Sequence, residues 1–357
     1  MAKLNVVTGA TGHLGNVLVR QLLAQGQRVR AVVQPGDDLT PLAGLAVEVA
    51  HADVTDAAAV SEAVRDADVV FHLAGLVSIT LGQHERLWQV NVGGTRNVVA
   101  ACRERSVGRL VHVSSVHALV EPRGGQLNEN AGFATTGEDY TRTKAEASRF
   151  VAAAAHDGLD AVQVLPTGVL GPWDFRLSEM GQFVARVGRH GMPVAISGGY
   201  DWVDVRDVAD GLLLAAEKGR RGEAYVLNGE WMSVSNLATS VAQAAGLHPP
   251  WLTVPLALVW PFAWVARAWE LLTHRRALLT PYALRQLSAD YRVDDSKARR
   301  ELGYTSRPVA VAIADAWRFL ASDPASPIHR AVVVQPGRAA ISGIHGAATP
   351  TSTGARR

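Results

Sequence analysis

The chain has 357 residues, 48% of them hydrophobic, and a formal net charge of +2. This length can form one large or two modest domains, and the balanced charge, without a long basic run, argues against nucleic acid as the main partner. Cys102 is the only cysteine, which excludes an intramolecular disulfide and fits a reducing compartment. The histidines are scattered and the single cysteine has no partner at the spacing of a zinc site, so we expect no metal site.

The first half of the chain alternates short apolar runs with longer helical stretches. The first run is too short for the core of a signal peptide, so we expect the protein to be made and kept in the cytosol. Helices are expected at 15–26, 57–67, 88–105 and from 139, and strands at 4–9, 28–33, 47–54, 68–75, 109–115 and 159–166. Strands separated by helices of this length pair in parallel through right-handed crossovers. The pattern therefore predicts an α/β fold with a doubly wound parallel sheet.

The sequence pattern changes after Pro166, where Gly and Pro separate shorter segments that mix apolar and polar residues. We expect residues 1–165 to form a dinucleotide-binding domain and residues 166–326 a smaller, partly interleaved substrate-binding domain. Residues 202–218 are expected to return to the first domain as a strand and a helix. The stretch 327–357 is rich in Ala, Gly, Ser, Thr and Pro and lacks the large apolar residues needed to fold, so we expect a disordered tail.

An apolar segment is the least usual feature of the second domain. No Asp, Glu, Lys or Arg occurs from residue 231 to 266, and the stretch 251–272 carries four tryptophans. A bilayer-spanning helix needs about 20 apolar residues, whereas this run is shorter and contains Pro255 and Pro261. We interpret the segment as a lid or an apolar substrate wall, with an interfacial membrane anchor as the alternative, because tryptophan suits both settings.

The motif TGATGHLG places Gly9, Gly12 and Gly15 between the first strand and the first helix. The first glycine allows a tight turn, the second lets the backbone approach a pyrophosphate, and the third lets the helix pack on the strand. The N–H groups and the dipole at the start of that helix favour a phosphate there. Because the motif follows a strand and opens an amphipathic helix, it predicts a dinucleotide site.

Two further strands end at the same sheet edge in residues that suit a nucleotide. Asp53 ends the third strand, where it could accept a hydrogen bond from an adenine amino group or simply cap a turn. The fourth strand ends in His72 to Gly75, whose small residues leave room for a nucleotide across the sheet edge.

A tyrosine and a lysine, Tyr140 and Lys144, lie four residues apart in a predicted helix and therefore on one face. The pair is either an exposed aromatic ring beside a solvated cation or a proton donor beside the charge that lowers its pKa. The spacing alone leaves both interpretations open.

A set of motifs between residues 8 and 304 resembles the extended branch of the short-chain dehydrogenase/reductase family, the NAD-dependent epimerase/dehydratase family. In chain order the motifs are TGATGHLG, ADVTD, HLAG, VNVGGT, VHVSS, YTRTK, LPTGVLGPWD, WVDVRDVAD and DDSKARRELGY. Within the family, LPTGVLGPWD and the tryptophan-bearing segment are most similar to the dihydroflavonol reductase and 3β-hydroxysteroid dehydrogenase group. The resemblance implies a Rossmann fold, a nicotinamide dinucleotide and a homodimer.

The resemblance also implies the roles of the site residues. Tyr140 would be the catalytic acid/base, and Lys144 would lower its pKa and bind the nicotinamide ribose. Ser115, with Ser114 as the competing choice, would bond the substrate oxygen. The cofactor-binding residues would be Gly9, Thr11, Gly12, His13, Leu14, Gly15, Gln34, Asp53, Val54, Leu73, Ala74, Gly75, Asn91, Tyr140, Lys144, Pro166, Thr167, Gly168 and Val169.

The choice between NAD and NADP depends on the end of the second strand. A carboxylate there holds the ribose diol of NAD, whereas an arginine accepts the 2′-phosphate of NADP. This chain has Gln34, which can bond either form, while Asp37 and Asp38 would repel a phosphate. We therefore expect NAD or NADP, with a slight preference for NAD.

The predicted function is hydride transfer between a nicotinamide and a hydrophobic ketone or secondary alcohol that is steroid-, terpenoid- or flavonoid-like, with tyrosine as acid/base. Relatives that dehydrate nucleotide sugars carry an acidic pair where this chain has Val116 and His117, which argues against that reaction. The alternatives are a nucleotide-sugar epimerase, whose diphosphate Arg176, Arg186 and Arg189 could bind, and a non-catalytic dinucleotide-sensing regulator. We interpret His117 as structural, although it could touch substrate.

Overall fold

The computed structural model describes residues 2–77, 84–261 and 281–333. Its centre is a seven-stranded parallel sheet in the order β11-β7-β5-β4-β1-β2-β3. The strands are β1 (Leu4–Thr8), β2 (Arg28–Val33), β3 (Glu48–His51), β4 (Val69–His72), β5 (Arg109–Val113), β7 (Ala161–Pro166) and β11 (Ala224–Leu227). The strand order reverses at β1, between the run toward β3 and the run toward β11, which confirms the predicted doubly wound sheet.

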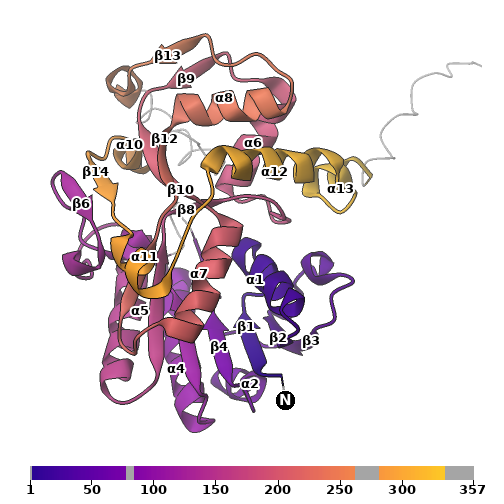
Figure 1. The fold of residues 1–357 in the computed structure, drawn as a ribbon, viewed down its shortest axis with the longest axis vertical. Coiled ribbons are helices and arrows are strands. Elements are labelled where there is room, and N and C mark those ends of the chain that lie inside the picture. Colours follow the sequence, from indigo (N-terminus) through magenta and orange to yellow (C-terminus); the bar gives the residue numbers. More distant parts are fainter. Residues whose placement is uncertain (1, 78–83, 262–280, 334–357) are drawn as a thin grey trace, which may run out of the picture.

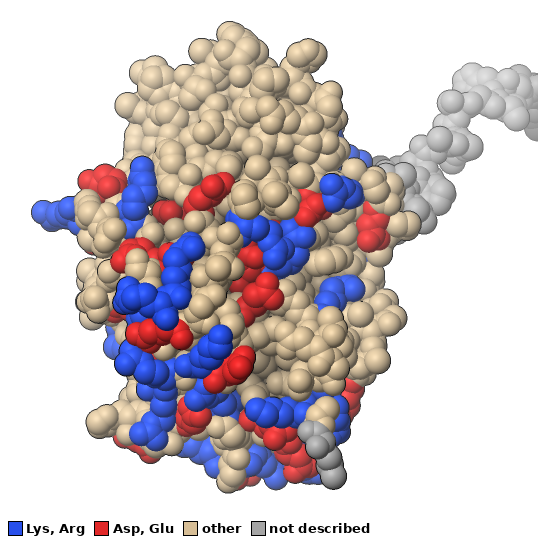
Figure 2. Space-filling view, viewed as in Figure 1, with Lys and Arg blue, Asp and Glu red and all other residues tan. Residues whose placement is uncertain are grey.

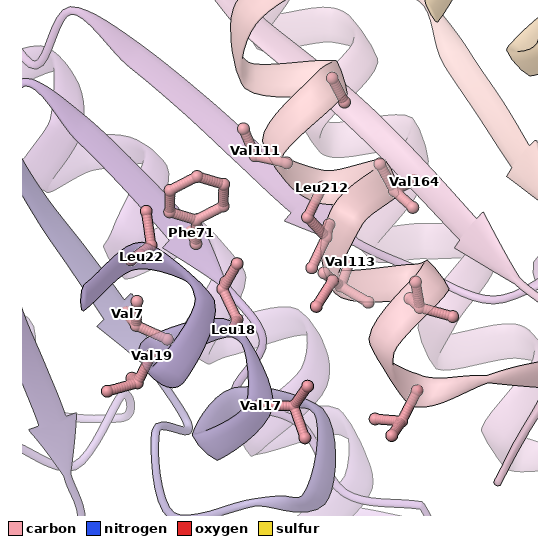
Figure 3. Close-up of a cluster of buried hydrophobic side chains, with 14 of the residues drawn as sticks. Val7, Val17, Leu18, Val19, Leu22, Phe71, Val111, Val113, Val164 and Leu212 are labelled. Carbon is pink, nitrogen blue, oxygen red and sulfur yellow. The ribbon is translucent and has the colours of Figure 1, made fainter. Parts of the chain in front are cut away.

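Helices cover both faces of this sheet (Figure 1). One face carries α1 (His13–Ala24) and α7 (Val205–Lys218), and the other carries α2 (Ala57–Ala63), α4 (Thr95–Glu104) and α5 (Asp139–His156). Successive side chains along a strand point to opposite faces of the sheet, so Leu110 and Val111 of β5 lie in different core clusters. Figure 3 shows α1 and α7 packing their apolar side chains onto the first face. Each fully buried side chain of this kind contributes about 1.5–3 kcal/mol relative to an exposed one.

The connection before α4 differs from the single helix predicted over 88–105. After α3 (His84–Leu87) the chain makes a π-helical turn, Trp88–Gly94, and only then enters α4. A Cβ on Gly94 would lie 2.7 Å from Cγ2 of Val54, so glycine lets the turn approach the loop after β3 this closely. A wide turn of this type is common at functional sites, and here it carries Asn91.

The rest of the chain builds a second layer of structure beyond the carboxyl ends of the main strands. It contains a three-stranded sheet of β8 (Gly168–Leu170), β10 (Gly199–Asp204) and β12 (Glu230–Ser233), and a pair of β9 (Val194–Ile196) with β13 (Leu252–Val254). Its core lies among α6 (Glu179–His190), α8 (Val234–Ala244) and α12 (Val309–Ser322). The remaining elements are α10 (Pro281–Leu287), α11 (Ser296–Leu302), α13 (Pro327–Val333), the pair β6 (Gly125–Leu127) with β14 (Tyr291–Val293), and the short turns η1 (Thr40–Leu42), η3 (Val116–Ala118) and η4 (Glu129–Ala131).

Two predicted boundaries are corrected. Of the stretch 202–218, the helix α7 returns to the main sheet, but its strand pairs with β8 and β12, and it is β11 that adds the seventh main strand. The predicted tail from Pro327 starts as helix α13, because proline suits a first helical position and the Ser326 hydroxyl accepts from the N–H of His329. The rest of that tail, 334–357, lies outside the described residues.

The apolar segment is described only in part, because residues 262–280 lie outside the described residues. The described part includes exposed apolar side chains on β13, on either side of it in the chain, and on its partner strand β9. Trp251 is 75% exposed, Leu258 is 62% exposed, and Leu252 and its strand partner Val194 are each 42% exposed. Figure 2 shows that the visible face of this end of the molecule is almost free of charged side chains, which gather instead over the main domain. Within the described residues, no helix has the length and apolar character to cross a bilayer.

Candidate active site

The turn after β1 brings the start of α1 to the carboxyl edge of the sheet. Gly9 has a φ of 70°, in the left-handed region, and a Cβ on Gly15 would lie 2.1 Å from the Gly9 carbonyl oxygen. The first i→i−4 bond of α1 runs from the Asn16 N–H to the Gly12 carbonyl, at 3.0 Å. The N–H groups of residues 13–15 therefore have no helical acceptor. This turn fits the pyrophosphate of a dinucleotide, as the glycine motif predicts.

The loop after β4 is fixed beside that turn. The Thr8 hydroxyl accepts from the N–H groups of Leu73 at 3.2 Å and Ala74 at 3.1 Å. Asn91, on the π-helical turn, accepts from the Leu76 N–H at 2.7 Å and donates to the Thr143 hydroxyl at 3.1 Å. Asn91 thus joins this loop to α5, and its predicted contact with the cofactor stays a prediction.

The ends of β2 and β3 also meet at this edge. The Gln34 amide donates to one carboxylate oxygen of Asp53 at 2.9 Å, and the other oxygen accepts from the N–H and hydroxyl of Thr55. The backbone bond from Thr55 is the main reason that the pKa of Asp53 lies below its usual value. The structure therefore brings the two predicted nucleotide residues together, with Asp53 also holding a turn.

The expected repulsion of a 2′-phosphate by Asp37 and Asp38 is offset in the structure. The Arg176 guanidinium lies 2.8 Å from the Asp37 carboxylate and 2.6 Å from the Thr11 hydroxyl, which itself donates to Asp37 at 2.7 Å. Asp38 is paired with Arg330 of α13 at 2.6 Å. The sequence did not predict either pairing, because each arginine lies more than a hundred residues from its partner, and it suggested Arg176 only for a sugar diphosphate.

The predicted catalytic residues converge at the end of β5. Ser115, Tyr140 and Lys144 are 6%, 8% and 8% exposed, so the interpretation of an exposed ring beside a solvated cation is wrong. The Lys144 ammonium donates to the Val113 carbonyl at 2.9 Å, and burial lowers its pKa to about 8. Helix α5 thus fixes the tyrosine and the lysine one turn apart, both against the strand that carries the serine.

The pKa of Tyr140 differs from the expectation. Burial raises this pKa above the ordinary value, and a hydrogen bond with Ser115 offsets the effect only in part. The Lys144 ammonium donates to the Val113 carbonyl, and the net effect of the surroundings on Tyr140 is a raised pKa. A buried phenol of this kind is held in its protonated, proton-donating form at neutral pH.

The two candidate serines have different partners. The Ser114 hydroxyl lies 2.6 Å from the hydroxyl of Ser148 on α5, whereas the Ser115 hydroxyl is bonded to Tyr140 and accepts from the His117 N–H at 3.3 Å. Ser114 therefore joins strand to helix, while Ser115 faces the tyrosine.

The chain after β7 closes the other side of the site. Pro166 ends β7, Gly168 and Val169 begin β8, and the Thr167 hydroxyl between them donates to Asn228 at 3.1 Å. The chain that follows β8 passes over the glycine turn, where the Pro172 carbonyl lies 2.9 Å from Nε2 of His13. The remaining predicted residues, Leu14 and Val54, pack in the cores on either side of the sheet.

The sequence did not predict that Tyr200, on β10, contacts His117, whose ring meets that of Tyr140. Tyr200 lies 60 positions further along the chain in a segment with no motif, and only the pairing of β8 with β10 brings it here. No group of three or more His, Cys, Asp or Glu able to hold a metal ion occurs in the described part of the chain.

A cavity of about 920 Å³ lies elsewhere, at the amino ends of the strands. Its lining includes Asn5, Val69, Asp207 and Arg307. In open α/β sheets ligands bind outside the carboxyl ends of the strands, so we place the active site with Tyr140 and not in this cavity.

Comparison with known proteins agrees with this geometry. Residues 5–228 match the model of the NAD dependent epimerase/dehydratase family. Sterol demethylase protein B of Methylococcus capsulatus is 37% identical over 316 residues, which are 87% of this chain and 96% of that protein. A 3 beta-hydroxysteroid dehydrogenase/Delta 5→4-isomerase of Mycobacterium tuberculosis is 32% identical, over 84% of this chain and 85% of that protein. The crystal structure of gox2253 has a TM-score of 0.76 at 30% identity, covering 88% of this chain and 98% of the other.

Proposed function

The chain belongs to the NAD-dependent epimerase/dehydratase family, in its dihydroflavonol reductase and 3β-hydroxysteroid dehydrogenase group, and we propose that it interconverts a hydrophobic secondary alcohol and its ketone. As a member of this group it is an NAD(P)-dependent oxidoreductase. The observation that carries the proposal is the buried set of Ser115, Tyr140 and Lys144 beside a glycine turn that fits a dinucleotide.

The side chains have distinct tasks in this mechanism. The nicotinamide, when bound, supplies or accepts the hydride. In the reducing direction the Tyr140 hydroxyl donates its proton to the carbonyl oxygen of the substrate, which Ser115 orients through its hydroxyl. Lys144 fixes Tyr140 through the bond to Val113 and offers its remaining N–H groups to the nicotinamide ribose.

The substrate class is supported by the printed activities of relatives. The names of the two relatives above are those of proteins that act on sterols and steroids, and a further relative, 30% identical over 84% of this chain, is named for a farnesyl quinoline ketoreductase activity. These are large apolar molecules. We therefore infer a steroid-like or terpenoid-like ketone or alcohol.

The cofactor is a nicotinamide dinucleotide, and the choice between NAD and NADP depends on whether the site accepts a 2′-phosphate. Arg176 and Arg330 offset the charges of Asp37 and Asp38, and Gln34 can bond a ribose diol or a phosphate. We infer that the site accepts both NAD and NADP, so the slight preference for NAD expected from the two carboxylates is not retained. The expected homodimer stays a prediction.

We also propose that the exposed apolar side chains Trp251, Leu252, Leu258 and Val194 rest against a lipid surface, which is where a steroid-like substrate dissolves. The visible face of this end of the molecule is almost free of charged side chains, which supports a contact governed by apolar burial on that face.

The test of the proposed function is turnover with defined probes. The purified protein is incubated with cholestanol and NAD or NADP in detergent, and reduced cofactor is measured by absorbance. Turnover that Tyr140→Phe lowers by about 10²–10⁴-fold supports the proposal. Cofactor binding by both proteins, seen as a shift in Tm, controls for misfolding. No turnover of cholestanol or of cholestanone, despite cofactor binding, would refute the substrate class.

A further inference from the structure

The segment between β8 and α6, residues 171–178, reaches from the second layer to the glycine turn. Nε2 of His13 lies 2.9 Å from the Pro172 carbonyl, and the Asn16 amide donates to the Trp173 carbonyl at 3.1 Å. His13 is the first residue of α1, and its backbone N–H is one of those without a helical acceptor. The second layer therefore contacts the turn at the point where the pyrophosphate of a dinucleotide fits.

Two arginines of the second layer hold the loop that follows β2, on the side where the adenosine ribose is expected. Arg176, within the same segment, lies 2.8 Å from the Asp37 carboxylate. Arg330, on α13, lies 2.6 Å from the Asp38 carboxylate and donates to the Thr40 hydroxyl at 3.0 Å. Contacts between the two layers therefore lie at both ends of the position expected for the adenosine diphosphate half of the cofactor.

Arg330 connects the two sets of contacts. Besides Asp38 and Thr40, its guanidinium donates to the carbonyl of Phe175 at 3.4 Å, and the Phe175 ring meets the Phe319 ring of α12 edge-on, with centroids 5.0 Å apart. Hydrogen bonds from Thr40 and Arg330 lower the pKa of Asp38 to about 2, so this carboxylate is charged at neutral pH. One side chain thus joins the loop after β2, the segment 171–178 and the C-terminal helices.

The backbone of this segment is strained. Trp173 has a φ of 63° and Leu177 a φ of 50°, both in the left-handed region although neither residue is glycine. Such conformations persist only where the surrounding structure holds them, and they cluster at ligand clamps and switch regions. The two strained positions flank Phe175 and Arg176, which make the contacts described above. We therefore expect the segment to relax away from the glycine turn when those contacts break.

We propose that the segment 171–178 and Arg330 form a clasp over the adenosine diphosphate half of the dinucleotide, so that the cofactor enters and leaves only while the clasp is open. The inference rests on the cofactor site of the proposed function and adds how the cofactor is exchanged. A clasp that closes equally well over the free and the occupied site slows association and release alike, and it leaves the affinity unchanged.

The test measures both rate constants of cofactor exchange. NADH is the probe, because it lacks the 2′-phosphate that an unpaired Asp38 would repel. Stopped-flow fluorescence follows its association and its displacement by excess NAD. In Arg330→Gln both rate constants should rise about tenfold, with the Kd for NADH within about threefold of its original value. Arg176→Gln should act in the same direction. Arg318→Gln, which removes an exposed arginine paired with Asp315 on α12, is the matched control and should change neither rate constant.

Salt supplies a second measurement on the same proteins. The ion pairs of Arg176 and Arg330 are partly exposed, so salt should weaken them and open the clasp. Raising sodium chloride from about 0.05 M to about 0.5 M should therefore accelerate NADH release more in the unaltered protein than in Arg330→Gln, which has already lost one pair.

The outcomes separate a clasp from a simple contact. Faster release without faster association, and hence a weaker affinity, would make Arg330 a direct cofactor contact and overturn the clasp. Unchanged rate constants in both variants, at unchanged Tm, would also overturn it while leaving the proposed function intact. The expected exchange rates in a protein that does not turn over cholestanol or cholestanone would support the clasp and refute only the substrate class. Absence of NADH binding by the unaltered protein would overturn both proposals.

Discussion

The Lys144 ammonium donates a hydrogen bond to the Val113 carbonyl, 2.9 Å away, and so ties helix α5 to the carboxyl end of β5. This bond sets the position of Tyr140, one helical turn earlier, against Ser115. The arrangement of the proposed catalytic residues is therefore built by the contact of one strand with one helix. Both partners lie in the buried interior, where loss of either would leave an unpaired polar group.

Replacing Lys144 by Met should change how stability depends on pH. Burial lowers the pKa of Lys144 to about 8, whereas an unfolded lysine has a pKa of about 10.4. Between these values the unfolded chain binds more protons than the folded one, so the stability contributed at this position rises with pH. Urea unfolding from pH 7 to pH 11 should show the unaltered protein gaining stability relative to Lys144→Met across that window. A constant difference would contradict the lowered pKa.

Substitution of the two serines should have separate effects. Ser115→Ala removes the hydroxyl bonded to Tyr140, and we expect kcat/KM for cholestanol to fall by about 10–100-fold with little change in Tm, because one oriented hydrogen bond at the reacting oxygen is lost. Ser114→Ala removes the bond to Ser148 and should lower stability by about 1 kcal/mol with activity retained. The reverse result would assign the catalytic role to Ser114.

The pH dependence of the two reaction directions should reflect the raised pKa of Tyr140. Because burial keeps the phenol protonated, the rate of ketone reduction should stay constant up to a pH above the ordinary tyrosine value of about 10. Alcohol oxidation, which needs the phenolate, should increase with pH over the same range. Stopped-flow measurement of hydride transfer in each direction checks this. A fall in reduction near neutral pH would indicate a lowered pKa instead.

Arg176 should affect NADP more than NAD. Arg176→Gln leaves the Asp37 carboxylate without its cation, so repulsion of a 2′-phosphate should weaken NADP binding by about tenfold, or about 1.4 kcal/mol. NAD, which lacks that phosphate, should bind within about threefold of its original affinity. Titration calorimetry measures both, and Arg186→Gln, an exposed arginine on α6, is the control. Equal weakening of both cofactors would place Arg176 at a part of the dinucleotide that they share.

Association with lipid should depend on Trp251 and Leu258. Sedimentation with neutral phosphatidylcholine vesicles should carry down the unaltered protein, and the double variant Trp251→Ser, Leu258→Ser should bind about tenfold more weakly because it buries less apolar area. Val311→Ser alters an equally apolar exposed residue on α12 and serves as the control. Binding that requires anionic lipid and disappears in salt would contradict an apolar contact.

The sequence alone determined the fold class, which follows from local patterns, and it predicted the main site residues from short motifs together with a family resemblance. Alternating apolar strands and helices set the doubly wound sheet, and the glycine turn and the Tyr140–Lys144 spacing are short-range features that need no knowledge of distant contacts. The family resemblance supplied Ser115 and its preference over Ser114. The structure places Ser115 against Tyr140, in keeping with that choice.

Tertiary structure decided what depends on distant residues or on burial. Arg176 and Arg330 reach Asp37 and Asp38 across 139 and 292 positions, and Tyr200 reaches His117 across 83. The effect of burial on the pKa of Tyr140 was equally out of reach, because a sequence gives the spacing of two groups but not the direction in which the ammonium points. Charge pairing and desolvation depend on which groups are neighbours in space, and the folded arrangement alone fixes those neighbours.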